Sequence, residues 1–157
     1  DYQVIRIRHQ NGAEVGIIKG EDYLAQGYFQ EVAVSPDGRW LVVVQSGQLL
    51  LWDMRYRRVQ RVISEAGLNT LDLAFSPDSK YLLTAGEDRL VRMYDLHEGW
   101  LITAFRAHPA RTEELFMHPQ GKTFLTVGEE GTARLFPLPT PAYTQAAARQ
   151  AVSAQEK

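Results

Sequence analysis

The feature that most constrains this chain is a segment that recurs three times at a nearly fixed interval. A turn proline marks each copy at Pro36, Pro77 and Pro119, with spacings of 41 and 42 residues. The aromatic residues that end the copies are each 42 residues apart: Trp52, Tyr94 and Phe136. A repeat of about 40 to 45 residues is the length of one four-stranded propeller blade, so the interval predicts an all-β fold.

Each copy shows strand and turn signals in the same order. Apolar and polar residues alternate through 71–75, and a Ser-Pro-Asp-Ser turn follows. The strands predicted for the middle copy are residues 71–75, 81–85, 90–95 and 100–106. Those of the first copy are residues 30–34, 40–45, 49–53 and 58–63. The third copy has strands at 113–117, 123–127 and 132–136. It lacks a fourth strand, because prolines cannot sustain a ladder at Pro137, Pro139 and Pro141.

Two further strands, residues 1–7 and 14–18, precede the first copy and align with the third and outer strands of a unit. The chain is therefore expected to contain about three and a quarter blades. The predicted parts are 1–20, the third and outer strands of an opening half-blade; 21–64 and 65–106, two complete blades; 107–138, a third blade lacking its outer strand; and 139–157, a proline-containing linker with a helical or disordered tail.

Three stretches carry a family resemblance: SPDGRWLVVV with LLLWD, SPDSKYLLTAGEDRLVRMYD, and HPQGKTFLTVGEEGTARLF. They resemble the WD repeats of beta-transducin-type propellers, and the resemblance covers residues 1–138. It implies four-stranded antiparallel blades and a rigid surface for protein contact.

The resemblance also implies a buried hydrogen-bond relay, formed by His, Ser or Thr, Asp and Trp in a typical blade. No copy here has the complete set, since Glu130 and Phe136 replace Asp and Trp in the third copy and Tyr94 replaces Trp in the second. The residues that match, and that we expect to be structural, are His108, Thr126, Thr84, Asp88 and Trp52.

Three and a quarter blades cannot close a ring and would expose strand edges that invite pairing. The chain therefore resembles the C-terminal half of a longer ring, completed by another chain or chain segment. Its start at Asp1 fits cleavage of a longer chain, a natural split into two chains, or an expressed fragment. Self-association of identical half-rings is a further alternative.

Composition and motifs give no sign of catalysis. The net charge of −2 disfavours nucleic acid as a partner, and the absence of cysteine excludes disulfides. No run of eighteen apolar residues predicts a membrane span. The histidines have no zinc-like spacing, and the acidic pairs 87–88 and 129–130 fall on equivalent turns. We therefore expect no catalytic residue, metal, cofactor or small-molecule substrate. Because no export segment is visible in the sequence, we also expect a cytoplasmic location.

The candidate partner-binding residues lie in connections between units. The longest connection, residues 20–30, contributes Tyr23, Tyr28 and Phe29, and aromatic residues commonly anchor interfaces. Packing of Leu24 and Phe29 beneath the loop is the alternative. Comparable places before the next units are held by Asn69 and Arg111.

A basic run at residues 55–61 is interpreted as charge that protects an outer edge strand, and binding of an anionic surface is the alternative. The predicted function is a non-catalytic protein–protein interaction scaffold, with a companion chain as the main partner. The alternative is a regulatory or substrate-docking propeller of an enzyme whose catalytic domain lies upstream of Asp1.

Overall fold

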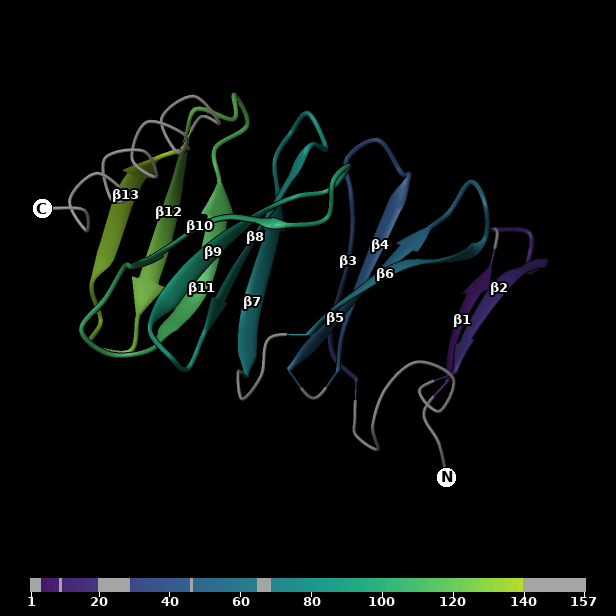
Figure 1. Ribbon diagram of the computed structural model, residues 1–157, viewed down its shortest axis with the longest axis horizontal. Coiled ribbons are helices and arrows are strands. Elements are labelled where there is room, and N and C mark those ends of the chain that lie inside the picture. The colour runs from purple at the N-terminus through teal and green to yellow at the C-terminus, as the bar shows by residue number, and fades with distance from the viewer. Residues whose placement is uncertain (1–3, 9, 20–28, 46, 65–68, 140–157) are drawn as a thin grey trace, which may run out of the picture.

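The computed structural model describes residues 4–8, 10–19, 29–45, 47–64 and 69–139, which form four antiparallel sheets (Figure 1). The first sheet pairs β1 (Val4–Arg8) with β2 (Glu14–Lys19). The second contains, in order, β3 (Phe29–Val34), β4 (Trp40–Gln45), β5 (Gln48–Asp53) and β6 (Arg58–Ser64). The third contains β7 (Thr70–Phe75), β8 (Tyr81–Gly86), β9 (Leu90–Asp95) and β10 (Leu101–Arg106). The fourth contains β11 (Thr112–Met117), β12 (Thr123–Gly128) and β13 (Ala133–Pro137).

This architecture confirms the predicted all-β partial propeller. Many strand ends differ from the predicted bounds by about one residue, and two of these differences show their local cause. Trp100 was expected to begin an outer strand, but its carbonyl accepts the Asp95 N–H at 3.0 Å and closes the turn, so β10 begins one residue later. Pro137 was expected to lie beyond the ladder, yet it ends β13 opposite Thr123, where an edge strand tolerates a missing N–H.

The sheets stack side by side in chain order (Figure 1). The first strands of neighbouring sheets contact one another, β3 with β7 and β7 with β11, so the sheets fan out from their inner edges. All of β4 is buried, as expected for a strand covered by a neighbouring sheet on each face.

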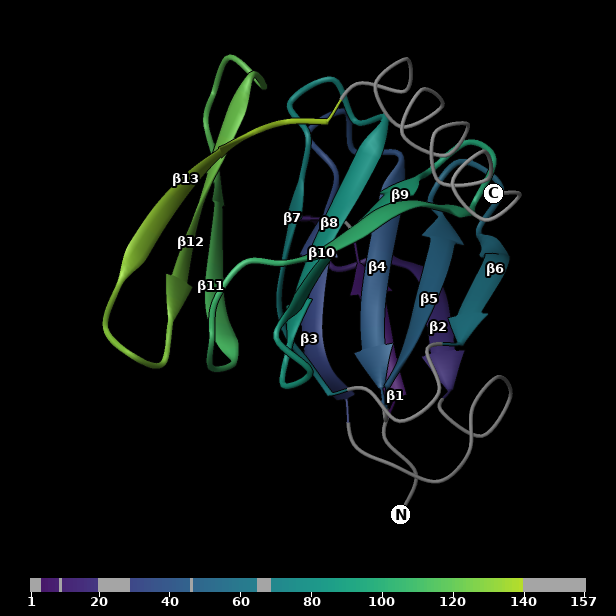
Figure 2. The same cartoon turned by 60° about the vertical axis from the view of Figure 1, so that its left-hand side comes forward.

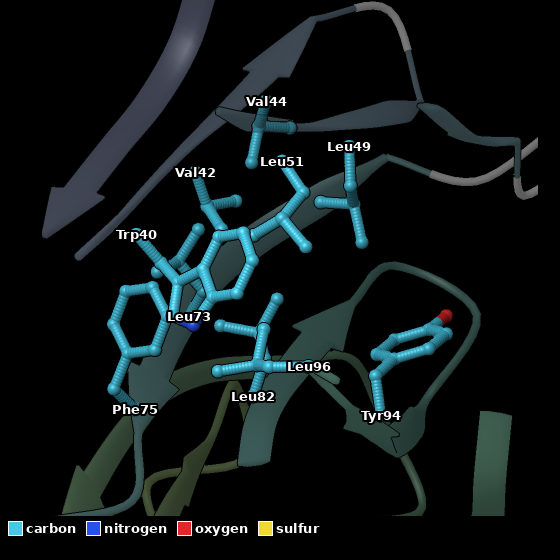
Figure 3. Close-up of a cluster of buried hydrophobic side chains, with 10 residues drawn as sticks. All are labelled: Trp40, Val42, Val44, Leu49, Leu51, Leu73, Phe75, Leu82, Tyr94 and Leu96. Carbon is cyan, nitrogen blue, oxygen red and sulfur yellow. The ribbon is translucent and has the colours of Figure 1, made fainter. Parts of the chain in front are cut away.

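Three apolar clusters join the four sheets. Between the first and second sheets, Ile18 packs with Leu41, Val43, Leu50 and Trp52. The second cluster, drawn in Figure 3, joins the second and third sheets through residues of β4, β5, β7, β8 and β9 and through Leu96: Trp40, Val42, Val44, Leu49, Leu51, Leu73, Phe75, Leu82, Tyr94 and Leu96. The third joins the third and fourth sheets: Leu83, Ala85, Val91, Met93, Ala107, Leu115 and Phe124.

The stack ends on an incomplete sheet. Figure 2 shows β13 at the margin of the described molecule, and within the described ranges the fourth sheet has three strands. The tail beyond residue 139, predicted to be helical or disordered, lies outside the described residues. Among the residues that the structure describes, no helix has the length and apolar character required to cross a membrane.

Candidate functional site

The predicted rim residues Asn69 and Arg111 occupy equivalent places in the third and fourth sheets. Their carbonyl oxygens accept the N–H groups of Glu87 and Glu129, each at 3.1 Å. Each connection is thereby fixed to the turn between the second and third strands of its own sheet. Asn69 also accepts a hydrogen bond from the side-chain amide of Gln30, which links the inner edges of the second and third sheets.

The charges on this rim largely neutralise one another. The Arg111 guanidinium lies 3.1 Å from Glu113 and 3.6 Å from Glu129. Phe29 is half-buried and packs against the first apolar cluster. Tyr23 and Tyr28 lie outside the described residues. The described rim therefore offers paired charges and amides rather than an aromatic anchor.

A polar network lies in the interface between the third and fourth sheets, beside the β12–β13 turn. The buried His108 places Nδ1 2.6 Å from a Glu130 carboxylate oxygen and Nε2 2.7 Å from the Thr126 hydroxyl. Thr132 donates its hydroxyl hydrogen to Glu130 at 2.6 Å. This donation, aided by His108, lowers the pKa of Glu130 to about 2 although burial opposes it. Glu130 thus takes the place expected of an aspartate.

His, Thr and a carboxylate in contact could suggest catalysis, but the geometry supports a structural role. Thr126 and His108 are both buried, so no substrate reaches the hydroxyl or the imidazole. The network instead ties the connection before β11 to β12 and to the turn that precedes β13. The described residues hold no group of three or more His, Cys, Asp or Glu placed to bind a metal ion.

The corresponding positions in the third sheet form a different pair. Thr84 is buried, and Asp88 accepts from the Arg92 guanidinium at 2.5 Å. Thr84 lies opposite Arg92 in the strand register, as Thr126 lies opposite Arg134. The two arginines were not among the residues expected to be structural, although alignment of these two copies places them at the same position and so contains the signal.

Trp52 contributes through packing. Its ring is buried in the first cluster, and a Cβ added to Gly16 on β2 would lie 3.1 Å from the ring. A side chain at position 16 would require the Trp52 ring to move by a few tenths of an ångström, so the glycine permits β2 to approach the tryptophan.

The outer face of the last sheet is apolar and exposed. Phe116, Leu125 and Leu135 lie opposite one another across β11, β12 and β13, and Phe116 and Leu135 are 51% and 66% exposed. The same register positions in the other two sheets pack against the sheet that follows: Ala74, Leu83 and Met93 in the third, and Ala33, Val42 and Leu51 in the second. The last sheet therefore carries a packing face that nothing in the described structure covers.

The opposite end of the stack is open in the same way. Val32 and Val34 on β3 are 43% and 54% exposed. Leu73 and Leu115 hold the place of Val32 in the next two sheets, and both are buried against the preceding sheet. The first sheet packs against β4, β5 and β6 but leaves these valines exposed.

A cavity of about 330 Å³ lies where turns of the second and third sheets meet. Its charged lining comprises three carboxylates and three basic side chains: Asp37, Asp78, Asp95, Arg39, Lys80 and His97. The Ser35 hydroxyl lowers the pKa of Asp37, and hydrogen bonds from Ser76 and Lys80 outweigh burial to lower the pKa of Asp78. Acidic and basic side chains therefore both line the cavity, which gives it no surface of a single sign.

Known proteins resemble this chain in its repeats. Residues 61–95 match the family model described as "WD domain, G-beta repeat". The match begins within β6 and ends with β9, so it joins the outer strand of one sheet to three strands of the next.

The chain is similar to three curated proteins. Protein groucho of Drosophila melanogaster is 30% identical over 114 residues, which cover 71% of this chain and 16% of groucho. COMPASS component SWD3 of Saccharomyces cerevisiae is 28% identical over 104 residues, 66% of this chain and 33% of SWD3. Periodic tryptophan protein 2 homolog of Dictyostelium discoideum is 29% identical over 112 residues, 68% of this chain and 12% of that protein.

The chain therefore spans one third or less of the length of each of these relatives. The repeat interval, the antiparallel four-stranded sheets and the match to the repeat model agree with one another. Together they identify the chain as a WD-repeat protein.

Proposed function

We propose that this chain is a non-catalytic scaffold for protein–protein contact and forms part of a propeller whose remaining blades come from another chain or chain segment. The observation that carries the proposal is the exposed apolar face formed by Phe116, Leu125 and Leu135. Contiguous exposed apolar patches mark interaction sites in soluble proteins. One relative is by its name a component of the COMPASS assembly, which supports a role in a complex.

The occupant we propose for this face is a further sheet of the same type. At the same register positions, each described sheet that has a successor buries these side chains against it. The exposed Val32 and Val34 at the other end fit the inner strands of another such sheet. A companion segment that also supplied the fourth strand of the last sheet would pair with the β13 edge, which removes a site of uncontrolled pairing.

Native mass spectrometry of the protein isolated from its own cells, followed by denaturing mass measurement, tests this proposal. The expected result is a complex from which a second, different chain is released, or a longer chain that contains this sequence. A mass equal to this chain alone, or to a multiple of it, would overturn the proposal. A cytoplasmic location remains a prediction, for which fractionation of the same cells is the measurement.

A matched pair of variants tests the end face itself. Replacing Phe116 and Leu135 with Asp should release the companion chain or open the ring. Replacing the exposed Ala104 and Gln120 with Asp adds the same charge away from this face and should leave the complex intact. Retention of the complex by both variants would exclude the end face as the contact.

A further inference from the structure

A basic and aromatic surface is formed by the β5–β6 turn, the first half of β6 and the residues that begin β10. Arg61 on β6 joins its two parts by reaching Gly99 in the β9–β10 turn, and both turns lie on the upper side in Figure 1. We call it the arginine surface and define it as Arg55, Tyr56, Arg57, Arg58, Arg61, Trp100 and Leu101. Residues 55–61 contain four arginines and no acid, although the whole chain has a net charge of −2. All seven members of the surface are exposed.

The two turns are built alike, which fixes the positions of these side chains. The Asp53 carboxylate accepts the N–H groups of Arg55 and Tyr56 at 2.9 and 3.1 Å. Asp95 does the same for the two residues at the corresponding places in the next sheet. The Tyr56 ring lies between the Arg55 and Arg58 guanidinium groups, each 5.6 Å from its centre.

Arg57 occupies a strained backbone conformation. Its φ of 54° lies in the left-handed region, and Gly99 holds the corresponding place in the next turn with a φ of 72°. A side chain in this region brings its Cβ close to the backbone, and glycine avoids that contact.

Arg61 connects the two turns. It pairs with Leu51 on the face that packs toward the third sheet, and its side chain reaches Gly99. A Cβ at Gly99 would lie 2.8 Å from the Arg61 guanidinium carbon, so the glycine makes room for this contact. The next two residues along the chain are Trp100, which is 62% exposed, and Leu101, so an exposed apolar pair directly follows the residue that Arg61 reaches.

None of the four arginines makes an ion pair with a described residue. Planar guanidinium groups bind carboxylates in bidentate fashion, and exposed aromatic side chains supply the apolar anchors of interfaces. We propose that the arginine surface binds an acidic, extended protein segment that carries an apolar side chain for Trp100 and Leu101. Edge protection accounts for charge on β6 but not for the exposed tryptophan beside it.

This interaction does not depend on the proposed completion of the propeller, because the surface lies on outer strands and not on the end faces. An acidic protein segment fits better than nucleic acid, since the net negative charge of the chain lacks the broad basic field that phosphate backbones require.

Fluorescence anisotropy of the full chain with a fluorescein-labelled synthetic peptide of sequence EEFEDLEE tests the proposal. We expect saturable binding that weakens as salt rises from about 50 to about 300 mM, and no binding of the uncharged counterpart QQFQNLQQ. Quenching of tryptophan fluorescence by acrylamide should fall on binding, because Trp100 is exposed whereas Trp40 and Trp52 are buried.

The charge-reversal pair R57E/R61E should lower the affinity at least about tenfold, and R55E/R58E should do the same while leaving the Gly99 contact intact. The control R89E/R106E makes an equal charge change at exposed residues near the other end of β9 and should change affinity less than about twofold. Equal losses in all three variants, undetectable peptide binding, or tighter binding of labelled poly(U) RNA than of the peptide would overturn the proposal.

Discussion

The interface between the first and second sheets and the interface between the third and fourth sheets use equivalent strand positions but different side-chain chemistry. Val43 on β4 and Thr126 on β12 hold equivalent register positions, facing Leu50 and Arg134 on the next strand. Both side chains are buried. Around Val43 the neighbouring cluster is entirely apolar, whereas Thr126 contacts the imidazole of His108.

The difference follows from the turns that flank these strands. Only two residues separate β4 from β5, and neither is a carboxylate, so a polar group inside the first interface would lack an acidic partner. The longer turn after β12 supplies Glu130, and the connection before β11 supplies His108. Burying a polar group is costly unless it is hydrogen-bonded. A polar residue at this buried strand position therefore requires a hydrogen-bonding residue in the adjacent turn or connection of the same blade.

Replacing Leu50 with Arg should break the first interface most severely. The substitution introduces the residue found at the equivalent positions 92 and 134, but without the Asp88 that pairs with Arg92. A buried charge that lacks a partner should cost more than about 3 kcal/mol of unfolding free energy. Urea unfolding measures the loss, with Leu50→Met as the volume-conserving control. An unchanged midpoint would show that this position reaches solvent.

Replacing Thr126 with Val tests the polar interface between the third and fourth sheets. The substitution keeps the shape of the side chain but removes the hydroxyl that lies 2.7 Å from His108 Nε2. The buried imidazole nitrogen would lose its partner, at a cost of about 1–3 kcal/mol in the same unfolding measurement. The reciprocal Val43→Thr should also destabilise the protein. If Val were neutral at position 126, the network would contribute nothing to stability.

Local strand patterns predicted the fold closely because they depend on nearby residues. Residues 40–45 and 90–95 were predicted as strands and are found with those bounds. The predicted strand at 132–136 begins one residue later, because the Thr132 hydroxyl turns to Glu130 and its carbonyl accepts the Gly128 N–H at 2.9 Å.

Exposure was harder to predict, since it depends on what packs against a residue rather than on the residue itself. Val32 and Leu73 are both apolar and hold the same register position, yet only the leucine is covered. The role of Arg61 beside Trp100 depends on a contact between strands of different sheets. Neither outcome is encoded in a local pattern.

Replacing Glu130 with Gln should make the free energy of unfolding depend less on pH in the acidic range. The folded-state pKa of Glu130 is about 2, below its ordinary 4.5, so its stabilisation is complete above pH 4.5 and is lost as the pH falls toward 2. Urea midpoints measured across that interval should change less in the variant. Asp37 and Asp78, whose pKa values are also lowered, leave a residual slope. Glu114→Gln, at an exposed position on β11, is the matched control, and identical curves for wild type and Glu130→Gln would contradict the expectation.

The smallest expected effect concerns the turns between the second and third strands of the second, third and fourth sheets. Gly47, Arg89 and Gly131 have φ values of 74°, 72° and 77° in the three corresponding turns. Of these three residues only Arg89 carries a side chain, at a cost of roughly 1–2 kcal/mol. Arg89→Gly relieves that strain but adds about 0.5–1 kcal/mol of unfolded-state entropy, so a net gain of about 0.5 kcal/mol is expected. Thermal unfolding measures the gain, and Arg89→Ala, which retains the Cβ, should show none. An equal gain from alanine would mean that the arginine side chain, rather than the backbone, is the source of the cost.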